Sequence, residues 1–159
     1  MRPSRFVFIA VSTVMLMSAS AFAAGVTFTE QDLAAYERGL RREIELVRAP
    51  AGRGAVVRRV APPVTQTIAE GAKAAGMSGE RYQEIRQAVD EVFTTLSFQG
   101  KIDGPRKIDM SRASPAMKAR LARDAFADLP LASAQALKMK SNVLVPLWSE
   151  YVRLVAVAG

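Results

Sequence analysis

The sequence contains neither cysteine nor histidine, and these two absences exclude several classes of site. Without thiolate and imidazole ligands, the chain cannot build a zinc finger or a cysteine-ligated iron–sulfur cluster. It cannot form a disulfide, and it cannot supply a thiol nucleophile or the histidine of a Ser-His-Asp triad. We therefore expect no metal site and no cofactor.

Aromatic residues are also scarce, at 7% of the 159 residues, but hydrophobic residues make up 50% of the chain. This composition is that of a globular protein rather than a disordered polyelectrolyte. The length is typical of one domain, and a chain of this size can bury about two-thirds of its unfolded surface. A core without disulfides is therefore sufficient to hold the fold.

The N-terminus has the three-part organisation of a secretory signal peptide. Arg2 and Arg5 form a positive start, and residues 6–17 form an apolar run without charge. Residues 21–23 (Ala-Phe-Ala) match the Ala-x-Ala pattern that precedes cleavage. A helix over the apolar run would be about 18 Å long, too short for a hydrocarbon layer of roughly 30 Å. We predict a signal peptide over residues 1–23, cleaved after Ala23.

Cleavage would leave a mature α-helical domain over residues 24–159 with 20 basic and 15 acidic residues, a net charge of +5. This mature chain contains no second apolar run long enough to cross a membrane. The predicted location is the bacterial periplasm. The alternative is that the first 24 residues are retained and anchor the chain to the inner membrane.

Residues 29–48 carry the clearest helix pattern. Thr29 and Asp32 are spaced like a capping box, in which polar side chains satisfy free amide groups of the first turn. Apolar residues then recur at steps of three and four, as on one face of a helix. These residues are Leu33, Tyr36, Leu40, Ile44 and Val47. The charged residues between them, including Glu43, are expected on the other faces.

Two further helices are predicted over residues 63–76 and 78–100. The first has a proline at its start and a narrow stripe of Val64, Ile68, Ala72 and Ala75, and the alternative is one kinked helix from about Ala55. The second begins at a serine cap and ends at a glycine. Its predicted inner face consists of Tyr82, Ile85, Val89, Val92, Phe93 and Leu96, and its predicted outer face of Glu80, Glu84, Asp90 and Glu91.

The last third of the chain predicts a fourth and a fifth helix. Ser114-Pro115 is a cap followed by a first-turn proline, and Pro130 is expected to end or bend this fourth helix. The fifth runs from about Ser133 towards the C-terminus, with a kink or break expected at Pro146. No stretch shows the alternation of a β-strand. The predicted fold class is all-α, a single domain formed by a bundle of four or five helices.

Positive charge is concentrated in residues 98–140, which hold nine basic and four acidic residues. The candidate anion-binding residues are Lys101, Arg106, Lys107, Arg112, Lys118, Arg120 and Arg123. In an exported protein, such a surface would bind lipid phosphate, lipopolysaccharide, an anionic cell-wall polymer or an acidic protein partner. The simpler interpretation is a solvated face that complements the acidic residues of 78–100. Nucleic acid is not expected as a partner, because no stacking platform of exposed aromatic residues is indicated.

Catalysis without histidine would have to use carboxylates, lysine or tyrosine. The helical glutamates fall on charged or exposed positions. Glu150 is the exception, because it lies between Trp148 and Tyr151 in the sequence, and a carboxyl group beside an apolar wall can act as a general acid. Such a residue is more often an ordinary one at the edge of a core. We predict no catalytic residue and no enzyme activity.

The function predicted from these patterns is binding. The first hypothesis is a small periplasmic helical protein that binds a protein partner in an interaction, chaperone-like or inhibitory role. The second is a peripheral protein that binds the anionic envelope surface through residues 101–123. The third, from a different class, is an enzyme that uses carboxylates alone. The sequence does not identify the partner or ligand.

Overall fold

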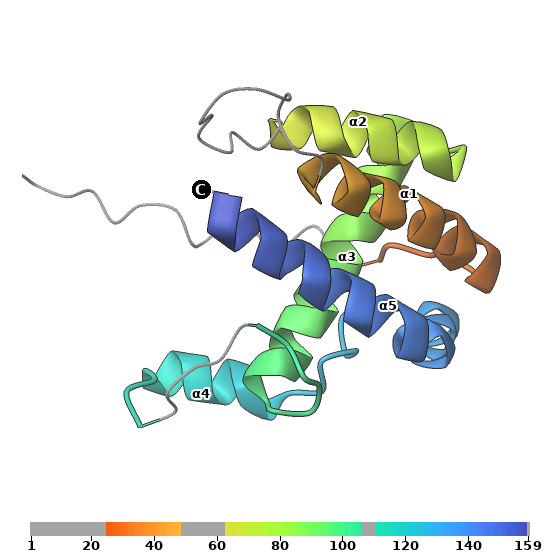
Figure 1. Ribbon diagram of the computed structural model, residues 1–159. Coiled ribbons are helices and arrows are strands. Elements are labelled where there is room, and N and C mark those ends of the chain that lie inside the picture. The colour runs from red at the N-terminus through yellow and green to blue at the C-terminus, as the bar shows by residue number, and fades with distance from the viewer. Residues whose placement is uncertain (1–24, 49–62, 106–110, 159) are drawn as a thin grey trace, which may run out of the picture.

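The structure, a computed structural model, describes residues 25–48, 63–105 and 111–158. Within these ranges the chain is entirely helical and forms one compact body (Figure 1). The five helices are α1 (Glu30–Arg48), α2 (Val64–Ala75), α3 (Gly79–Phe98), α4 (Pro115–Ala122) and α5 (Leu131–Ala158). The prediction of an all-α single domain is confirmed for the described ranges.

The structure covers only part of the predictions for the N-terminal half of the chain. The predicted signal peptide, residues 1–23, lies outside the described residues, and so does the path of residues 55–61. α2 begins at Val64, close to the predicted start near Pro63, but Pro63 is the N-cap residue rather than the predicted first residue of the helix. In the described part of the chain, no helix combines the length and the apolar composition that a membrane span requires.

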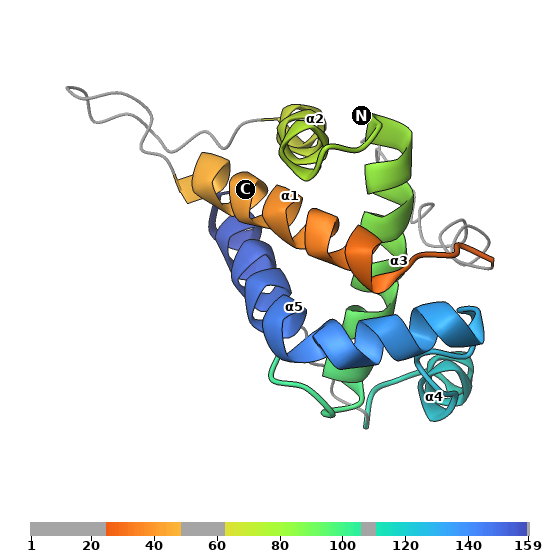
Figure 2. The same ribbon diagram turned by 90° about the vertical axis from the view of Figure 1, so that its right-hand side faces the viewer.

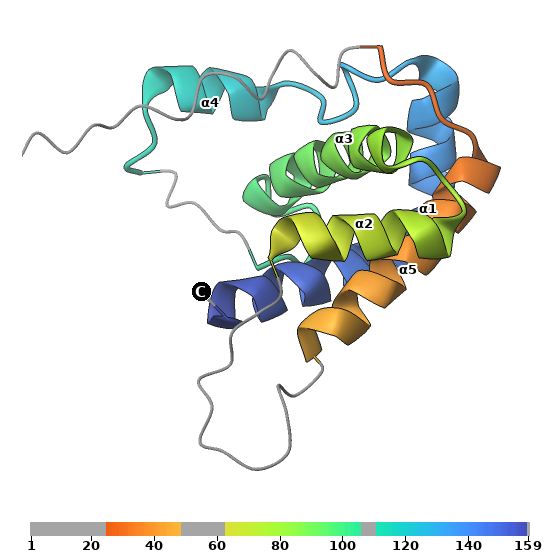
Figure 3. The same cartoon turned by 90° about the horizontal axis from the view of Figure 1, so that it is seen from above.

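The packing of the helices divides the body into two ends. α1 packs against α2 and α5, and α2 also packs against α3. α3 runs the length of the body, with α2 at one end and α4 at the other (Figure 1, Figure 2). α4 stands apart from α1 and α2, beside α3 (Figure 3). The core therefore lies between α1, α3 and α5, and α4 lies at the periphery.

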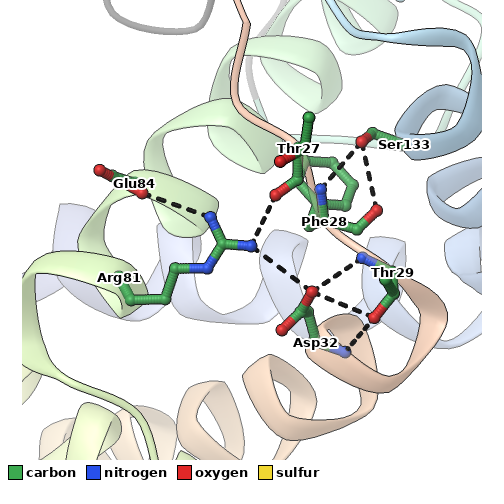
Figure 4. Close-up of polar contacts among 7 residues, drawn as sticks. All are labelled: Thr27, Phe28, Thr29, Asp32, Arg81, Glu84 and Ser133. Carbon is green, nitrogen blue, oxygen red and sulfur yellow. Dashed lines mark hydrogen bonds and ion pairs between the residues drawn. The ribbon is translucent and has the colours of Figure 1, made fainter.

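The N-terminus of α1 is fixed by the predicted capping box (Figure 4). The amide of Asp32 donates to Thr29 Oγ1 at 3.2 Å, and the amide of Thr29 donates to Asp32 Oδ2 at 2.9 Å. Burial would raise the pKa of Asp32, but the hydrogen bonds from Thr29 and the charge of Arg81 outweigh it and hold this pKa below its usual value. The carboxylate is therefore stabilised in its ionised form.

The segment before α1 is tied to two distant helices (Figure 4). Ser133 Oγ on α5 accepts from the amide of Phe28 at 2.9 Å and donates to its carbonyl at 3.2 Å. Arg81 on α3 donates to the carbonyl of Thr27 at 2.5 Å and to Asp32. The buried Phe28 ring joins the core. This segment is therefore part of the domain rather than a tail.

The ends of α2 and α3 are both glycine-terminated turns. Gly100 has φ of +68°, and its amide donates to the carbonyl of Ser97 while the amide of Lys101 donates to that of Leu96. Gly76 has φ of +71° and makes the same pattern after α2. These are Schellman motifs, in which glycine adopts the left-handed backbone without steric cost. Both predicted helix ends are confirmed.

The inner face of α2 differs from the predicted stripe. Val64 is 51% exposed, whereas Thr67 and Gly71 are buried beside Ala72 and Ala75. Ala72 and Ala75 of the predicted stripe are buried and Ile68 packs against the core, so the prediction is wrong only at Val64. Small residues line the close contact between α1 and α2, because bulky side chains would hold the helices apart.

Of the last two helices, only α4 departs from its predicted boundaries. α4 begins at Pro115 with Ser114 as its cap, as predicted, but it ends at Ala122 because Arg123 is extended. Pro130 neither ends nor bends it. α5 continues through Pro146 and changes direction partway along its length (Figure 2). The missing amide of Pro146 and its clash with the preceding turn account for a bend rather than a break.

Candidate functional site

A groove of about 380 Å³ separates α3 from α4 and the chain that follows it. We call it the α3–α4 groove. Its apolar lining consists of Ala88, Val92, Ala119, Ala125 and Leu129. Its polar lining consists of Glu91, Thr95, Arg120, Arg123, Asp124 and Asp128. The groove therefore has a floor of buried apolar side chains, formed by Ala88, Val92 and Leu129, and a rim of charged ones.

The two walls of the groove are held at a fixed distance by one amide side chain. Gln99 follows the last turn of α3, and its Nε2 donates to the carbonyls of Leu121 at 2.8 Å and Arg123 at 2.9 Å. These carbonyls belong to the end of α4, where the intrahelical hydrogen bonds run out. The buried side chain of Leu121 is the apolar anchor of α4. Gln99 and Leu121 together position the basic wall against α3.

The charges on the rim pair with one another. Arg120 lies 3.2 Å from Glu91, and Arg123 lies 3.4 Å from Asp128. Burial raises the pKa of Glu91, and the neighbouring Arg120 opposes that shift. Asp124 accepts a hydrogen bond from the amide of Phe126 at 3.1 Å. Within the described ranges, no cation is paired with Asp124.

The seven predicted anion-binding residues are only partly brought together. Arg120 and Arg123 line the groove, each beside a carboxylate, whereas Lys101 and Lys118 are exposed outside it. Arg112 is exposed on the turn before α4. Arg106 and Lys107 lie outside the described residues. The structure therefore places two of the predicted cations in a site of mixed charge.

Glu43 is the clearest departure from the sequence prediction. It was expected on an outer face of the first helix, yet it is 0% exposed. It lies seven residues after Tyr36, two helical turns along, so both project from the same face of α1. This spacing was the available signal that Glu43 points inward. The general expectation that the helical glutamates are exposed is therefore wrong at this position.

Glu43 is the centre of a buried polar cluster that includes every tyrosine of the chain. Tyr82 donates its hydroxyl to Glu43 Oε1 at 2.7 Å, and Arg86 Nε lies 3.3 Å from the same oxygen. The Arg86 guanidinium lies 5.0 Å from the centre of the Tyr151 ring, and the Tyr36 and Tyr82 rings are 5.4 Å apart. Residues of α1, α3 and α5 thus meet in one cluster, in which the α3 residues contact the carboxylate directly.

The electrostatics of this cluster favour neutral tyrosines and a charged Arg86 guanidinium. Burial raises the pKa of Tyr36 and of Tyr82, so both phenols stay protonated. Burial would lower the pKa of Arg86, but the charge of Glu43 outweighs it and raises this pKa. Because Glu43 and Tyr82 expose none of their surface, a substrate cannot reach them. The cluster joins helices and offers no open catalytic site.

Glu150, the carboxylate weighed as a general acid, is half-buried and forms an ion pair with Arg48 at the end of α1. Trp148, its predicted apolar neighbour, is buried and donates its indole N–H to Asp90 on α3 at 2.8 Å. Asp90 is therefore engaged by the core, although it was expected on the outer face of α3.

In the described residues, no group of three or more acidic side chains is placed to hold a metal ion.

Comparison with family models, curated proteins and solved structures finds no match for this chain. The groove was not predictable from the sequence, because it depends on where the chain after α4 turns back. The early end of α4 at Ala122 is what places Ala125 and Leu129 against α3.

Proposed function

We propose that this chain is an exported, periplasmic helical protein that acts by binding a protein partner in the α3–α4 groove. The observation that carries the proposal is the composition of the groove, which has an apolar floor and a rim with charges of both signs. Protein-binding surfaces combine a desolvated apolar centre with a polar rim. A volume of about 380 Å³ is enough for a few side chains of a partner.

The mixed rim favours a polypeptide over the anionic envelope surface. A uniformly anionic polymer in the groove would meet Glu91, Asp124 and Asp128 as well as the two arginines. Like charges brought together at an interface are unfavourable and select against such a partner. The envelope-binding alternative is left with the exposed Lys101 and Lys118 and with Arg112. Carboxylate-only catalysis has less support, because its candidate Glu150 forms an ion pair with Arg48 and the cluster around Glu43 is closed to solvent.

Site-specific photocrosslinking in the native cells tests this proposal. A benzophenone amino acid at Ala119, which lines the groove, is expected to form a protein adduct. The matched control position is Ala116, which is exposed on the same helix but does not line the groove. An adduct at Ala119 that is absent at Ala116 supports docking in the groove. Equal adducts, or none at either position, would contradict it.

The envelope alternative predicts a different result. Binding through exposed cations would make the purified protein sediment with vesicles that contain anionic lipid, and added salt would release it. Lys101→Glu and Lys118→Glu should then weaken sedimentation. We expect little retention on such vesicles at 0.15 M salt. Strong salt-sensitive retention, without a crosslink at Ala119, would replace the first proposal by the second.

Export has its own expected result. If the signal peptide is cleaved after Ala23, the protein in the periplasmic fraction begins at Ala24 and lacks Arg2 and Arg5. Intact mass and N-terminal sequencing measure this directly. Full-length protein in the inner-membrane fraction would support the retained anchor. Full-length protein in the cytosol would remove the proposal of export.

A further inference from the structure

Among the described residues that line it, the α3–α4 groove has one more negative than positive charge, although one of its walls comes from the basic segment of residues 98–140. Its lining includes three carboxylates (Glu91, Asp124, Asp128) and two guanidinium groups (Arg120, Arg123). Each arginine is already beside one carboxylate, at 3.2 Å and 3.4 Å. The third carboxylate, Asp124, is exposed, and no cation of the described residues is paired with it.

Building on the proposed function, we infer that the groove binds a polypeptide segment in which a lysine or arginine lies beside small or medium apolar side chains. The basic side chain would reach Asp124, and the apolar ones would cover the buried Val92 and Leu129 and the exposed Ala119 of the α4 wall. A segment with an acidic residue at that point would meet an uncompensated carboxylate. Such a repulsive element discriminates between partners as effectively as an attractive one.

The local geometry at Asp124 suits this role. Its Oδ1 is engaged by the amide of Phe126, which fixes the orientation of the carboxylate in a side-chain turn. A fixed carboxylate loses less rotational freedom when a cation binds than a freely rotating one does. Arg123 and Asp128, on either side, hold each other and so do not neutralise Asp124. The rim therefore presents one preoriented negative charge.

The inference is tested with three fluorescent octapeptides that differ only in charge: Ser-Ala-Leu-Arg-Ala-Leu-Arg-Ser and its variants with Gln or Glu in place of Arg. Anisotropy titrations with the purified protein at low salt give the Kd of each. We expect the Arg peptide to bind about tenfold more tightly than the Glu peptide, with the Gln peptide between them. Equal affinities, tighter binding of the Glu peptide, or no binding by any peptide would overturn the inference.

Asp124→Asn is the diagnostic variant, because asparagine can still accept the hydrogen bond from Phe126. It is expected to weaken binding of the Arg peptide about two- to fivefold and to leave the Gln peptide unchanged. Asp103→Asn is the matched control, since Asp103 is exposed and does not line the groove. An equal effect of both variants would also overturn the inference.

A further variant separates this inference from the proposed function. Ala119→Trp fills the groove from the exposed face of α4, so it is expected to block every peptide that binds there. If all three peptides bind equally and Ala119→Trp blocks them all, the groove is a polypeptide site without the charge preference. If Ala119→Trp has no effect on a bound peptide, the location of the site is wrong as well.

Discussion

Replacing Glu43 with methionine is expected to lower the free energy of unfolding by about 3–5 kcal/mol. Methionine fills a similar volume but accepts no hydrogen bond from Tyr82 and carries no charge for Arg86. The Tyr82 hydroxyl lies in a fully buried position, and the Arg86 side chain is 20% exposed. The Tyr82 hydroxyl and the Arg86 guanidinium would stay buried without the carboxylate that pairs with them. Leaving such groups unpaired accounts for most of the stability lost when one member of a buried pair is removed.

A triple replacement distinguishes this explanation from a simple packing defect. Glu43→Met with Tyr82→Phe and Arg86→Met removes the three polar groups together, so neither the Tyr82 hydroxyl nor the Arg86 guanidinium is left buried without Glu43. Buried ion pairs contribute little net stability relative to well-packed apolar residues of the same volume. Among the described residues, Glu43 Oε2 has no hydrogen-bond partner, so the native pair is itself incompletely satisfied. We therefore expect the triple variant to recover most of the loss.

Urea denaturation followed by circular dichroism at 222 nm measures both variants under the same conditions. Glu45→Met, at an exposed position two residues along the same helix, is the matched control and should change stability by less than about 0.5 kcal/mol. If the triple variant is as unstable as the single one, the loss comes from packing and the argument from unsatisfied polar groups fails.

The sequence was most informative where one local rule acts alone. Thr29, Ser78 and Ser114 were predicted as helix caps, and each accepts the expected backbone amide. Helical spacing also identified the buried side of α3, from Tyr82 to Leu96. A helix cap is decided by a few adjacent residues, and the buried face of a helix is decided by the helical repeat of its apolar residues. Neither requires knowledge of what lies across the core.

The prediction failed where a residue is selected by a neighbour from elsewhere in the chain. Glu43 is buried because Tyr82 and Arg86 on α3 donate hydrogen bonds to it. The sequence of α1 alone does not identify those partners. Thr67 is buried on α2, which packs against both α1 and α3. The α3–α4 groove depends in the same way on the early end of α4. These features arise from tertiary contacts, which outweigh local propensity.

The closest approach of α1 and α2 gives the second large expected effect. An added Cβ at Gly39 would lie 2.4 Å from Tyr82 Cε2 and 2.6 Å from the carbonyl oxygen of Gly71. The Tyr82 ring cannot turn aside easily, because its hydroxyl is bonded to Glu43 and its face is packed near Tyr36. The carbonyl belongs to the backbone of α2, so relieving that contact requires the two helices to separate.

Gly39→Ala is therefore expected to cost about 2–3 kcal/mol, even though alanine is favoured over glycine in a helix by about 1 kcal/mol. Gly79→Ala is the matched control, since a Cβ there meets no atom within 4 Å at the first residue of α3. It should leave stability unchanged or raise it slightly. The urea midpoints of both variants measure the difference, and equal shifts would mean that the α1–α2 contact is looser than its distances indicate. Because the α3–α4 groove lies at the other end of α3, Gly39→Ala should leave the peptide affinities unaltered wherever the chain is still folded.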